Sequence, residues 1–122
     1  MILPDSSIWL EYFTEGSLAE QSEQIVTTKE GVIVPTIVVF EVYRQLRKRL
    51  DEKEVLFAVT QMEEKNIAPL TSELSLYAAE LSLKYKLAMA DSIIYATVLF
   101  FQSQLVSRDN DFRNLPSCQV IS

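Results

Sequence analysis

The stretch VIVPTIVVFEVYRQLRKRL, residues 32–50, changes its pattern at a single proline. Val32 to Thr36 is a short apolar run, and Pro35 ends it because proline cannot donate a hydrogen bond to a strand ladder. Apolar side chains then recur at helical spacing up to Leu50, at Val39, Tyr43, Leu46 and Leu50. The stretch therefore predicts a buried strand that passes directly into a helix. This helix should be buried almost all round in its first half and basic at its end.

Short apolar runs of the same kind occur at four other places in the chain. We expect them to form the remaining strands: Ile2–Pro4, Asn66–Leu70, Gln104–Ser107 and Cys118–Ser122. Segments with helical periodicity separate these strands. Short apolar strands in such an alternation are typical of a parallel sheet that is buried on both faces. The pattern therefore predicts an α/β fold, a three-layer α/β/α sandwich with a short-stranded, mainly parallel central sheet.

Polar side chains mark where several of the helices begin. Ser6 or Ser7 can cap the first helix by accepting a backbone N–H. Ser17 and Glu20 match the S-x-x-E capping box of a second helix, and Asp51 offers a similar start to a later one. Two further helices are expected from their apolar residues: one with Leu74, Tyr77, Ala78, Leu81 and Tyr85 on one side, and one at Ala88–Phe101, apolar on every face beyond Asp91 and Ser92.

Length and composition bound the class of protein. A chain of 122 residues that is 48% apolar can build a core of useful size, so we expect a single domain over residues 1–122. The formal net charge of −6 argues against a general nucleic-acid coat protein, which normally carries a basic excess. An enzyme stays compatible with this charge, because its acidic residues can be concentrated in a metal site.

No segment has the pattern of a targeting or membrane sequence. Residues 1–16 contain acidic residues and lack the basic start of a signal peptide. The longest nearly apolar stretch, Ala88–Phe101, is interrupted by Asp91 and is shorter than the ~20 residues of a membrane span. Cys118 is the single cysteine, which fits a reducing compartment and a small, partly buried core residue. We therefore expect a cytoplasmic protein with no membrane partner.

The absence of histidine restricts the chemistry most strongly. It excludes Ser-His-Asp and Cys-His nucleophilic catalysis, imidazole acid–base chemistry and histidine-containing zinc sites. Only two glycines are present, Gly16 and Gly31, and neither lies in a phosphate-cradling glycine-rich loop. If the chain is an enzyme, catalysis by a hard metal ion held by Asp and Glu is the natural candidate.

Four carboxylates lie at strand ends or within apolar helices, where a charged residue that only keeps the surface soluble is not expected. Asp5 follows the first strand, and Asp109 comes just after the Gln104–Ser107 strand. Glu41 lies in the second turn of a helix among valines and a phenylalanine, and Asp91 opens the most apolar helix. In doubly wound parallel sheets, ligands bind beyond the carboxyl ends of the strands, at the point where the strand order reverses. All four carboxylates are expected near that edge.

Each of these carboxylates also has a purely structural interpretation. Asp5 and Asp91 can each complement a helix N-terminus, and Asp109 can be an ordinary turn residue. Glu41 can be exposed and paired with Arg44. Taken together, convergent acids without matching bases would repel each other strongly in a cleft of low dielectric. A divalent cation removes that problem, and oxygen-only ligation is what Mg²⁺ or Mn²⁺ prefers.

Four segments resemble, in this order, the acidic motifs of a known family: LPDSSIWLEYF, PTIVVFEVYRQL, KLAMADSIIYATV and LVSRDNDF. They are similar to the motifs of PIN-domain ribonucleases, most closely the VapC-like toxins of bacterial and archaeal toxin–antitoxin pairs. The likeness covers essentially the whole chain. It implies a PIN-like fold over residues 1–122.

The resemblance also implies roles for individual residues. Asp5, Glu41 and Asp91 would be the central catalytic and metal-binding carboxylates, and Asp109 the fourth. Supporting roles are implied for four other residues: Asp111, Ser6, Ser7 and Ser107. The implied activity is hydrolysis of RNA phosphodiester bonds by a Mg²⁺-dependent endoribonuclease, with Mn²⁺ as a possible alternative. The implied partners are an RNA substrate, a cognate antitoxin protein and a second copy in a homodimer.

Basic and aromatic side chains are candidates for RNA contacts. The possible phosphate contacts are Arg44, Arg47, Lys48, Arg49 and Arg108, with Lys84, Lys86 and Arg113 as further candidates. A solvated helix end explains the first four equally well. Trp9, Tyr12 and Tyr43 can stack on bases, but their helical spacing favours core packing for most of them.

Two other classes of function remain open. The DND segment, residues 109–111, also suggests a Toprim-like nuclease or a transferase of the DxD type, although such schemes place a Glu after the first strand, where this chain has Asp5. A catalytically inactive PIN-like binding module is the second alternative. The four acidic residues count against it, because lost catalysis usually loosens such positions.

Overall fold

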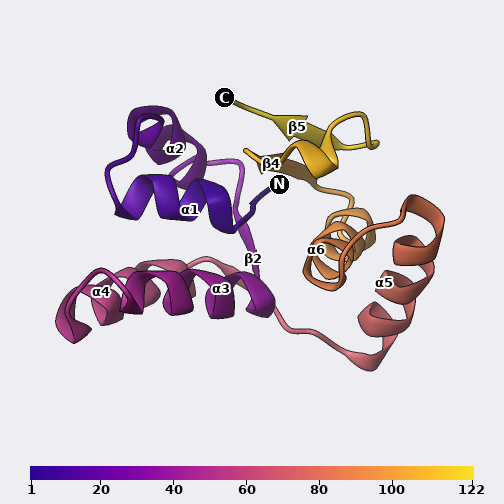
Figure 1. The fold of residues 1–122 in the computed structure, drawn as a ribbon, viewed down its shortest axis with the longest axis horizontal. Coiled ribbons are helices and arrows are strands. Elements are labelled where there is room, and N and C mark those ends of the chain that lie inside the picture. The colour runs from indigo at the N-terminus through magenta and orange to yellow at the C-terminus, as the bar shows by residue number, and fades with distance from the viewer.

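The computed structural model describes residues 1–122, in which five strands and six α-helices alternate along the chain (Figure 1). The strands are three or four residues long, as the short apolar runs predict: β1 Ile2–Pro4, β2 Ile33–Pro35, β3 Asn66–Ala68, β4 Gln104–Ser107 and β5 Cys118–Val120. The helices are α1 Ser6–Phe13, α2 Ala19–Val26, α3 Thr36–Arg47, α4 Glu52–Glu63, α5 Ser72–Tyr85 and α6 Met89–Phe100. A short 3₁₀ turn, η1 Asn110–Phe112, lies between β4 and β5.

All strand pairs in the sheet are parallel. β1 pairs with β4 and β4 with β5, while β2 pairs with β3. A single parallel bridge between Ile2 and Val32 joins the two sets, so the strands lie in the order β3-β2-β1-β4-β5. The chain builds outward from β1 to β3, then crosses back to place β4 on the other side of β1. The strand order therefore reverses between β1 and β4, which is the switch point of a doubly wound sheet.

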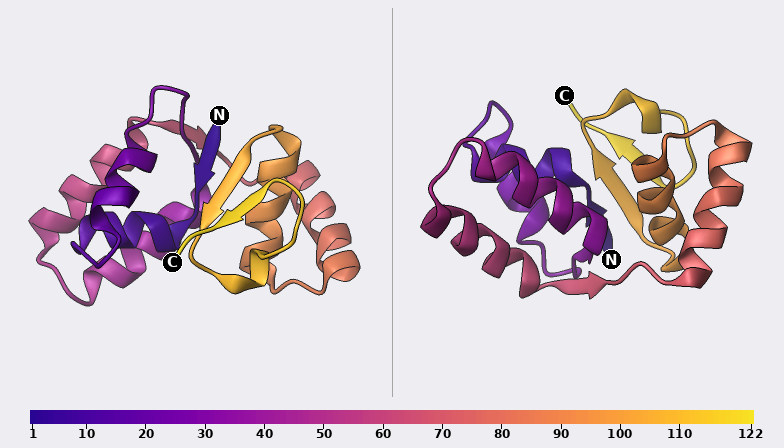
Figure 2. Two further views of the ribbon diagram at one scale, coloured as in Figure 1. Left: turned by 90° about the horizontal axis from the view of Figure 1, so that it is seen from above. Right: turned by 60° about the horizontal axis from the view of Figure 1, so that its bottom comes forward.

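Helices cover the sheet on both sides, which gives the predicted three layers. Figure 2 shows α1 to α4 on one side of the strands and α5 with α6 on the other. One cluster of 25 buried apolar residues forms the core between these layers. Its largest fully buried side chains include Trp9 from α1, Tyr95 from α6 and Phe112 from η1. The apolar length of every helix falls below what crossing a membrane requires.

The first helix has a different cap from the one expected. Asp5, rather than Ser6 or Ser7, is the N-cap of α1, and its side chain accepts a hydrogen bond from the backbone N–H of Ser7. The structural role considered for Asp5 is therefore real. At α4 the expected cap is confirmed, because the Asp51 side chain accepts from the backbone N–H of Glu54 at 2.8 Å.

The capping box predicted for the second helix is not formed. α2 begins at Ala19, after an N-cap, Leu18, that has no side-chain cap hydrogen bond. The backbone N–H of Leu18 instead donates to Glu11 Oε2 of α1, at 3.0 Å. The box would satisfy the backbone N–H groups of Ser17 and Glu20, so Glu11 satisfies a different donor at this helix start, in a contact that local spacing does not predict.

The buried face of α3 is rotated by about one residue from the predicted face. Val38, Val42 and Leu46 are fully buried, whereas Phe40 is 64% exposed and Tyr43 is 41% exposed. The expectation that the first half is buried all round is wrong. Each of the two stripes has helical spacing, so periodicity alone could not choose between them, and packing against α1, α4 and α6 decides.

Candidate active site

The acidic residues gather at the carboxyl ends of β1 and β4, the two strands that meet at the switch point. Asp5 directly follows β1, and its backbone N–H donates to the carbonyl of Val106 in β4 at 3.1 Å. Asp109 lies two residues beyond the end of β4. Because the strands are parallel and adjacent, their ends bring residues more than a hundred positions apart to one edge of the sheet.

Asp5 is the most buried of these carboxylates, with 4% of its surface exposed. Its Oδ1 accepts from the backbone N–H and the hydroxyl of Ser7, at 3.0 and 2.5 Å, and its Oδ2 accepts from the Ser107 hydroxyl at 2.5 Å. Burial raises the pKa of Asp5, and the hydrogen bonds from Ser107 and Ser7 offset part of that rise. The side chain is therefore held in one orientation by donors from α1 and from β4.

Ser7 and Ser107 extend this network to the loop after β4. Ser107 is completely buried, and its hydroxyl oxygen also accepts from the backbone N–H of Asp109 at 2.9 Å. Ser7 likewise accepts from the backbone N–H of Arg108 at 2.9 Å. Two serines thus connect Asp5 to the backbone that carries Asp109, so the positions of the two carboxylates are coupled.

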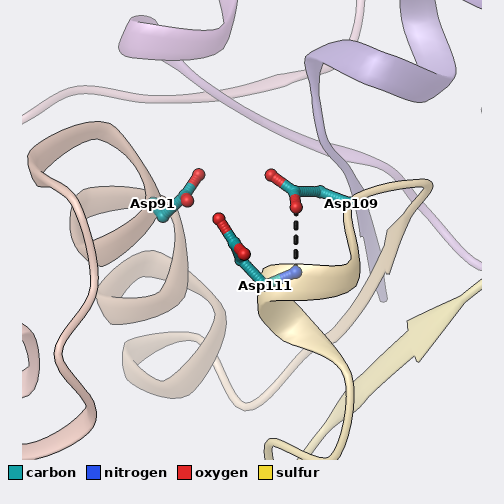
Figure 3. A group of neighbouring side chains, drawn as sticks. All are labelled: Asp91, Asp109 and Asp111. Atoms are coloured by element: carbon teal, nitrogen blue, oxygen red, sulfur yellow. Dashed lines mark hydrogen bonds between the residues drawn. The ribbon is translucent and has the colours of Figure 1, made fainter.

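Three aspartates lie closest together, as Figure 3 shows. Asp91 points from the first turn of α6 toward Asp109 and Asp111 of the turn after β4, and one carboxylate oxygen from each lies within 4.8 Å of the others. Asp109 also caps η1 by accepting from the backbone N–H of Asp111 at 2.8 Å. Asp111, for which only a supporting role was expected, therefore lies in the cluster on the same footing as Asp109.

Electrostatic repulsion marks Asp91 as the centre of the acidic group. Its pKa is raised to about 6, first by desolvation and then by the charges of the other carboxylates: Asp109, Asp111, Asp5 and Glu41. The side chain makes no hydrogen bond to the helix, and α6 is capped at Ala88 without side-chain help. Asp91 therefore does not cap α6 by a hydrogen bond, although its place in the first turn lets its charge complement the helix N-terminus.

Glu41 faces the same region from α3. It is half-buried, and its pKa is raised, mainly by desolvation. The nearby Ser6 hydroxyl offsets part of this rise, and the negative charge of Asp5 adds to it. Its Oε1 is buried without a hydrogen-bond partner, and Glu41 forms no ion pair with Arg44. An unpartnered buried carboxylate oxygen is costly, so this atom is suited to a cationic ligand.

The five carboxylates have no basic partner in the protein. The one ion pair in the structure joins Arg108 to Glu11, outside the acidic group. An all-oxygen, all-carboxylate donor set with one orphaned buried oxygen fits a hard divalent cation, because the cation would neutralise charge that the fold leaves uncompensated. The residues that would hold it are Asp91, Asp109 and Asp111, with Asp5 and Glu41 on the side of β1 and α3.

Glu11 is a site-adjacent residue that the sequence analysis missed. It is 8% exposed, pairs with Arg108 and accepts from the backbone N–H of Leu18. A Cβ at Gly16 would lie 2.0 Å from Glu11 Oε2, so the glycine leaves the space that this carboxylate fills. The signal was available, because Glu11 stands in the apolar run IWLEYF much as Glu41 stands among valines.

The basic and aromatic candidates for RNA contacts differ in their exposure and in their contacts within the protein. The four basic residues at the end of α3 are all exposed, whereas Arg108 is engaged by Glu11. Among the aromatic candidates Trp9 is a core residue, at 1% exposed, while Tyr43 faces solvent. Cys118 is partly buried, as expected, and burial raises the pKa of its thiol to about 11, so it is unreactive as a nucleophile.

Comparison with known proteins agrees with this geometry. Residues 2–117 match the family profile of the PIN domain. A toxin–antitoxin complex from Klebsiella pneumoniae contains a chain of similar structure (TM-score 0.84, 23% identity, 98% of this chain and 97% of that chain covered). VapC20 of Mycobacterium tuberculosis, described as a sarcin–ricin loop cleaving toxin, is also similar (TM-score 0.82, 16% identity, both chains covered completely).

A third similar structure is FitAcB from Neisseria gonorrhoeae (TM-score 0.69, 19% identity, 91% of this chain and 89% of that chain covered). No curated protein matches the sequence significantly. At these identities the solved structures share the fold, and the family match extends over nearly all of the sequence. The match does not agree with the Toprim-like interpretation of the DND segment. This chain belongs to the PIN-domain family.

Proposed function

We propose that this protein is a Mg²⁺-dependent endoribonuclease and the toxin of a toxin–antitoxin pair. The observation that carries the proposal is the group of five carboxylates at the β1–β4 switch point, which has no basic partner and includes the cluster of Asp91, Asp109 and Asp111. Membership of the PIN family and the likeness to toxins such as the sarcin–ricin loop cleaving VapC20 support it. The missing histidine agrees with chemistry that needs no protein nucleophile.

The catalytic and metal-binding residues in this proposal are Asp5, Glu41, Asp91, Asp109 and Asp111. A bound Mg²⁺ or Mn²⁺ would supply Lewis-acid activation of water and neutralise charge on the phosphodiester. Asp5 is held rigid by Ser7 and Ser107, and Ser107 also fixes the backbone at Asp109. Asp91 must release its proton before its carboxylate can bind a cation, so cation binding should weaken below pH about 6.

Replacement of Asp91 tests the function directly. Asp91→Asn should reduce Mg²⁺-dependent cleavage of a fluorescent RNA by roughly 10²-fold or more, the scale on which loss of one group that stabilises the transition state lowers kcat. Cleavage is followed on gels with EDTA-treated protein to which MgCl₂ or MnCl₂ is returned. Glu80→Gln, an exposed acid on α5, is the matched control and should keep full activity.

The outcomes of this experiment separate the two remaining functions. Undiminished cleavage by the Asp91→Asn protein would refute the site. If the unmodified protein cleaves none of a broad set of RNAs with either metal, the inactive binding module becomes the better account. Loss of cleavage in both variants would point to a preparation fault. A parallel purification from an empty vector excludes a contaminating nuclease as the source of any cleavage that persists.

Exposed apolar surface supports the two protein partners in the proposal, a second copy and an antitoxin. Leu76 and Leu83 on α5 are 72% and 78% exposed, and Phe57 on α4 is 67% exposed. A pocket of about 820 Å³ between α1 and α4 is lined in part by Phe57, Tyr12 and Phe13. Large exposed apolar side chains that cluster are typical of protein interfaces. We place this pair of partners, with the RNA substrate, in the cytoplasm.

A further inference from the structure

A polar pocket of about 390 Å³ adjoins the acidic group next to Asp5. Seven residues line it, and only one of them is hydrophobic: Ser7, Leu10, Glu11, Thr14, Gln45, Arg49 and Arg108. Ser7 and Arg108 also belong to the network around Asp5, because the Arg108 backbone donates to Ser7 and the Ser7 hydroxyl donates to Asp5. A group bound in this pocket would therefore lie next to the carboxylates.

The charges of the pocket are opposite in sign to those of the acidic group. Arg49 and Arg108 face one carboxylate, Glu11, so the pocket carries a net positive charge. Only Nη1 of the Arg108 guanidinium is engaged, by Glu11, and the other guanidinium donors of this side chain have no partner in the protein. Arg49 has no acidic partner at all. Free donors on two guanidinium groups are well suited to phosphate oxygens.

The pocket also distinguishes among the basic residues of α3. Arg49 lines it, whereas Arg44, Arg47 and Lys48 do not, although all four are exposed. Gln45, one turn after Glu41, adds an amide without a hydrogen-bond partner to the wall. A pocket of this size holds a phosphate with part of a sugar, and its polar lining does not favour an apolar ligand.

We propose that this pocket binds an RNA phosphate that flanks the scissile phosphodiester, through Arg49 and Arg108. The proposal rests on the proposed function and assigns it a second binding element. A polyanion approaching five carboxylates is repelled until cations are present, and a fixed positive pocket beside them offsets part of that repulsion. Glu11 holds the Arg108 side chain at the pocket wall and at the same time reduces the positive charge there.

The test measures RNA binding in EDTA, so that it is independent of cleavage. Fluorescence anisotropy of a labelled 12-nucleotide single-stranded RNA gives the association constant over a range of KCl concentrations. Loss of one phosphate contact to single-stranded RNA should reduce the slope of log K against log salt by about 0.7. Arg49→Gln should show this reduction and weaker binding. Lys29→Gln, an exposed basic residue between α2 and β2 that lies outside the pocket and outside the phosphate candidates, is the control and should leave the slope unchanged.

Glu11→Gln provides a test of opposite sign. Amide for carboxylate keeps a similar shape and an acceptor for Leu18, but it removes the charge that opposes Arg108. RNA binding should therefore become tighter and the salt slope steeper. A purely structural role for Glu11 predicts unchanged or weaker binding. A thermal melt checks that each variant is folded, and if Glu11→Gln is not, the comparison of Arg49→Gln with Lys29→Gln still decides.

Three results would overturn the pocket assignment. They are equal slopes for the Arg49→Gln and unmodified proteins, equal reductions for Arg49→Gln and Lys29→Gln, and no RNA binding by the unmodified protein at low salt. Failure of the proposed function looks different. If the protein binds RNA with the predicted slope changes but never cleaves it, the pocket assignment stands and the nuclease assignment fails. If the protein cleaves RNA but Arg49→Gln has no effect on binding, the nuclease assignment stands and the pocket assignment fails.

Discussion

At the scale of single residues, the site consists of carboxylates in surroundings that disfavour their charged form. Asp5, Glu41 and Asp91 all have a pKa raised by burial, and the charges of neighbouring acids raise those of Glu41 and Asp91 further. Residues whose environment disfavours the charged form, gathered in one place without bases, are a frequent property of functional sites. In the proposed function, a bound cation would compensate this charge.

This arrangement predicts how the stability of the metal-free protein changes with pH. Asp91 ionises near its usual pKa of 3.8 in the unfolded chain but at about 6 in the folded protein. Between these values the folded state retains a proton that the unfolded state releases. Stability contributed by Asp91 is therefore complete below pH about 4, and it is lost as pH rises through about 6.

The Asp91→Asn variant isolates this contribution. In EDTA at pH 7 the variant should melt at a higher temperature than the unmodified protein, and the difference should shrink as the pH approaches 4, because the raised pKa of Asp91 then no longer matters. Thermal melts by circular dichroism at several pH values provide the measurement. A variant that melts lower at pH 7 would show that Asp91 stabilises the fold and is not held against repulsion.

Asp111 provides a second residue-level prediction. Its carboxylate lies within 4.8 Å of those of Asp91 and Asp109, so its loss should matter as much as the loss of Asp109. We expect Asp109→Asn and Asp111→Asn each to raise the Mn²⁺ concentration needed for half-maximal cleavage by at least about tenfold. Titration of activity with metal separates this effect from a general loss of activity.

The local sequence alone suggested a different outcome for this pair. From the order of the residues in the last motif, Asp109 was expected to be the metal-site residue and Asp111 to keep a supporting role. A large loss for Asp109→Asn together with normal metal dependence for Asp111→Asn would restore that interpretation. The geometry favours equal roles because η1 turns both side chains toward α6 (Figure 3).

At the scale of elements, the loop between α1 and α2 depends on a contact with the loop after β4. Glu11 of α1 connects the start of α2 to Arg108, and Gly16 leaves room for its carboxylate. Gly16→Ala should destabilise the protein by roughly 1–3 kcal/mol, since the added methyl group displaces a carboxylate that is held in place. Urea unfolding at constant pH measures the change.

A double-mutant cycle tests the stated cause. In a Glu11→Ala background the cost of Gly16→Ala should largely disappear, because the clashing carboxylate is gone. Gly31→Ala is the control: its strain comes from a backbone φ of +95°, so its cost should be the same in both backgrounds. An additive cycle at Gly16 would mean that the glycine serves the backbone and not the Glu11 side chain.

At the scale of the whole molecule, α5 exposes two large apolar side chains, Leu76 at 72% and Leu83 at 78%. Leu76 and Leu83 are seven residues apart, so they lie on one face of that helix. If the homodimer forms here, Leu76→Glu with Leu83→Glu should convert it to a monomer in light scattering after gel filtration. The same change at exposed Leu56 on α4 is the control and should leave the dimer intact.

The double variant also tests the proposed homodimer. Because both leucines are exposed, the double variant should melt within a few degrees of the unmodified protein once the dimer has dissociated. A dimer that survives the double change would place the homodimer elsewhere on the surface. A monomeric unmodified protein would remove the homodimer from the proposal without touching the acidic site.

Much of the architecture follows from local pattern. Short apolar runs and helical periodicity depend on residues a few positions apart, and they predicted the strands and the alternation with helices. Predictions failed where the local sequence allowed two alternatives, or where a contact from another part of the chain took the place of a local one. Two apolar stripes on α3 have the same spacing, and α2 begins after Leu18, whose backbone N–H donates to Glu11, so the box of Ser17 and Glu20 does not form.

The sequence by itself determined the parallel α/β class, the exclusion of histidine chemistry and the acids at the strand ends, because each depends on residue type and near neighbours. Only the tertiary structure decided that β4 lies beside β1, which brings Asp5 to Ser107, and that α6 packs so that Asp91 lies near Asp109 and Asp111. It also paired Glu11 with Arg108, 97 residues away. Contacts across such separations depend on how the whole core packs, and no local spacing encodes that.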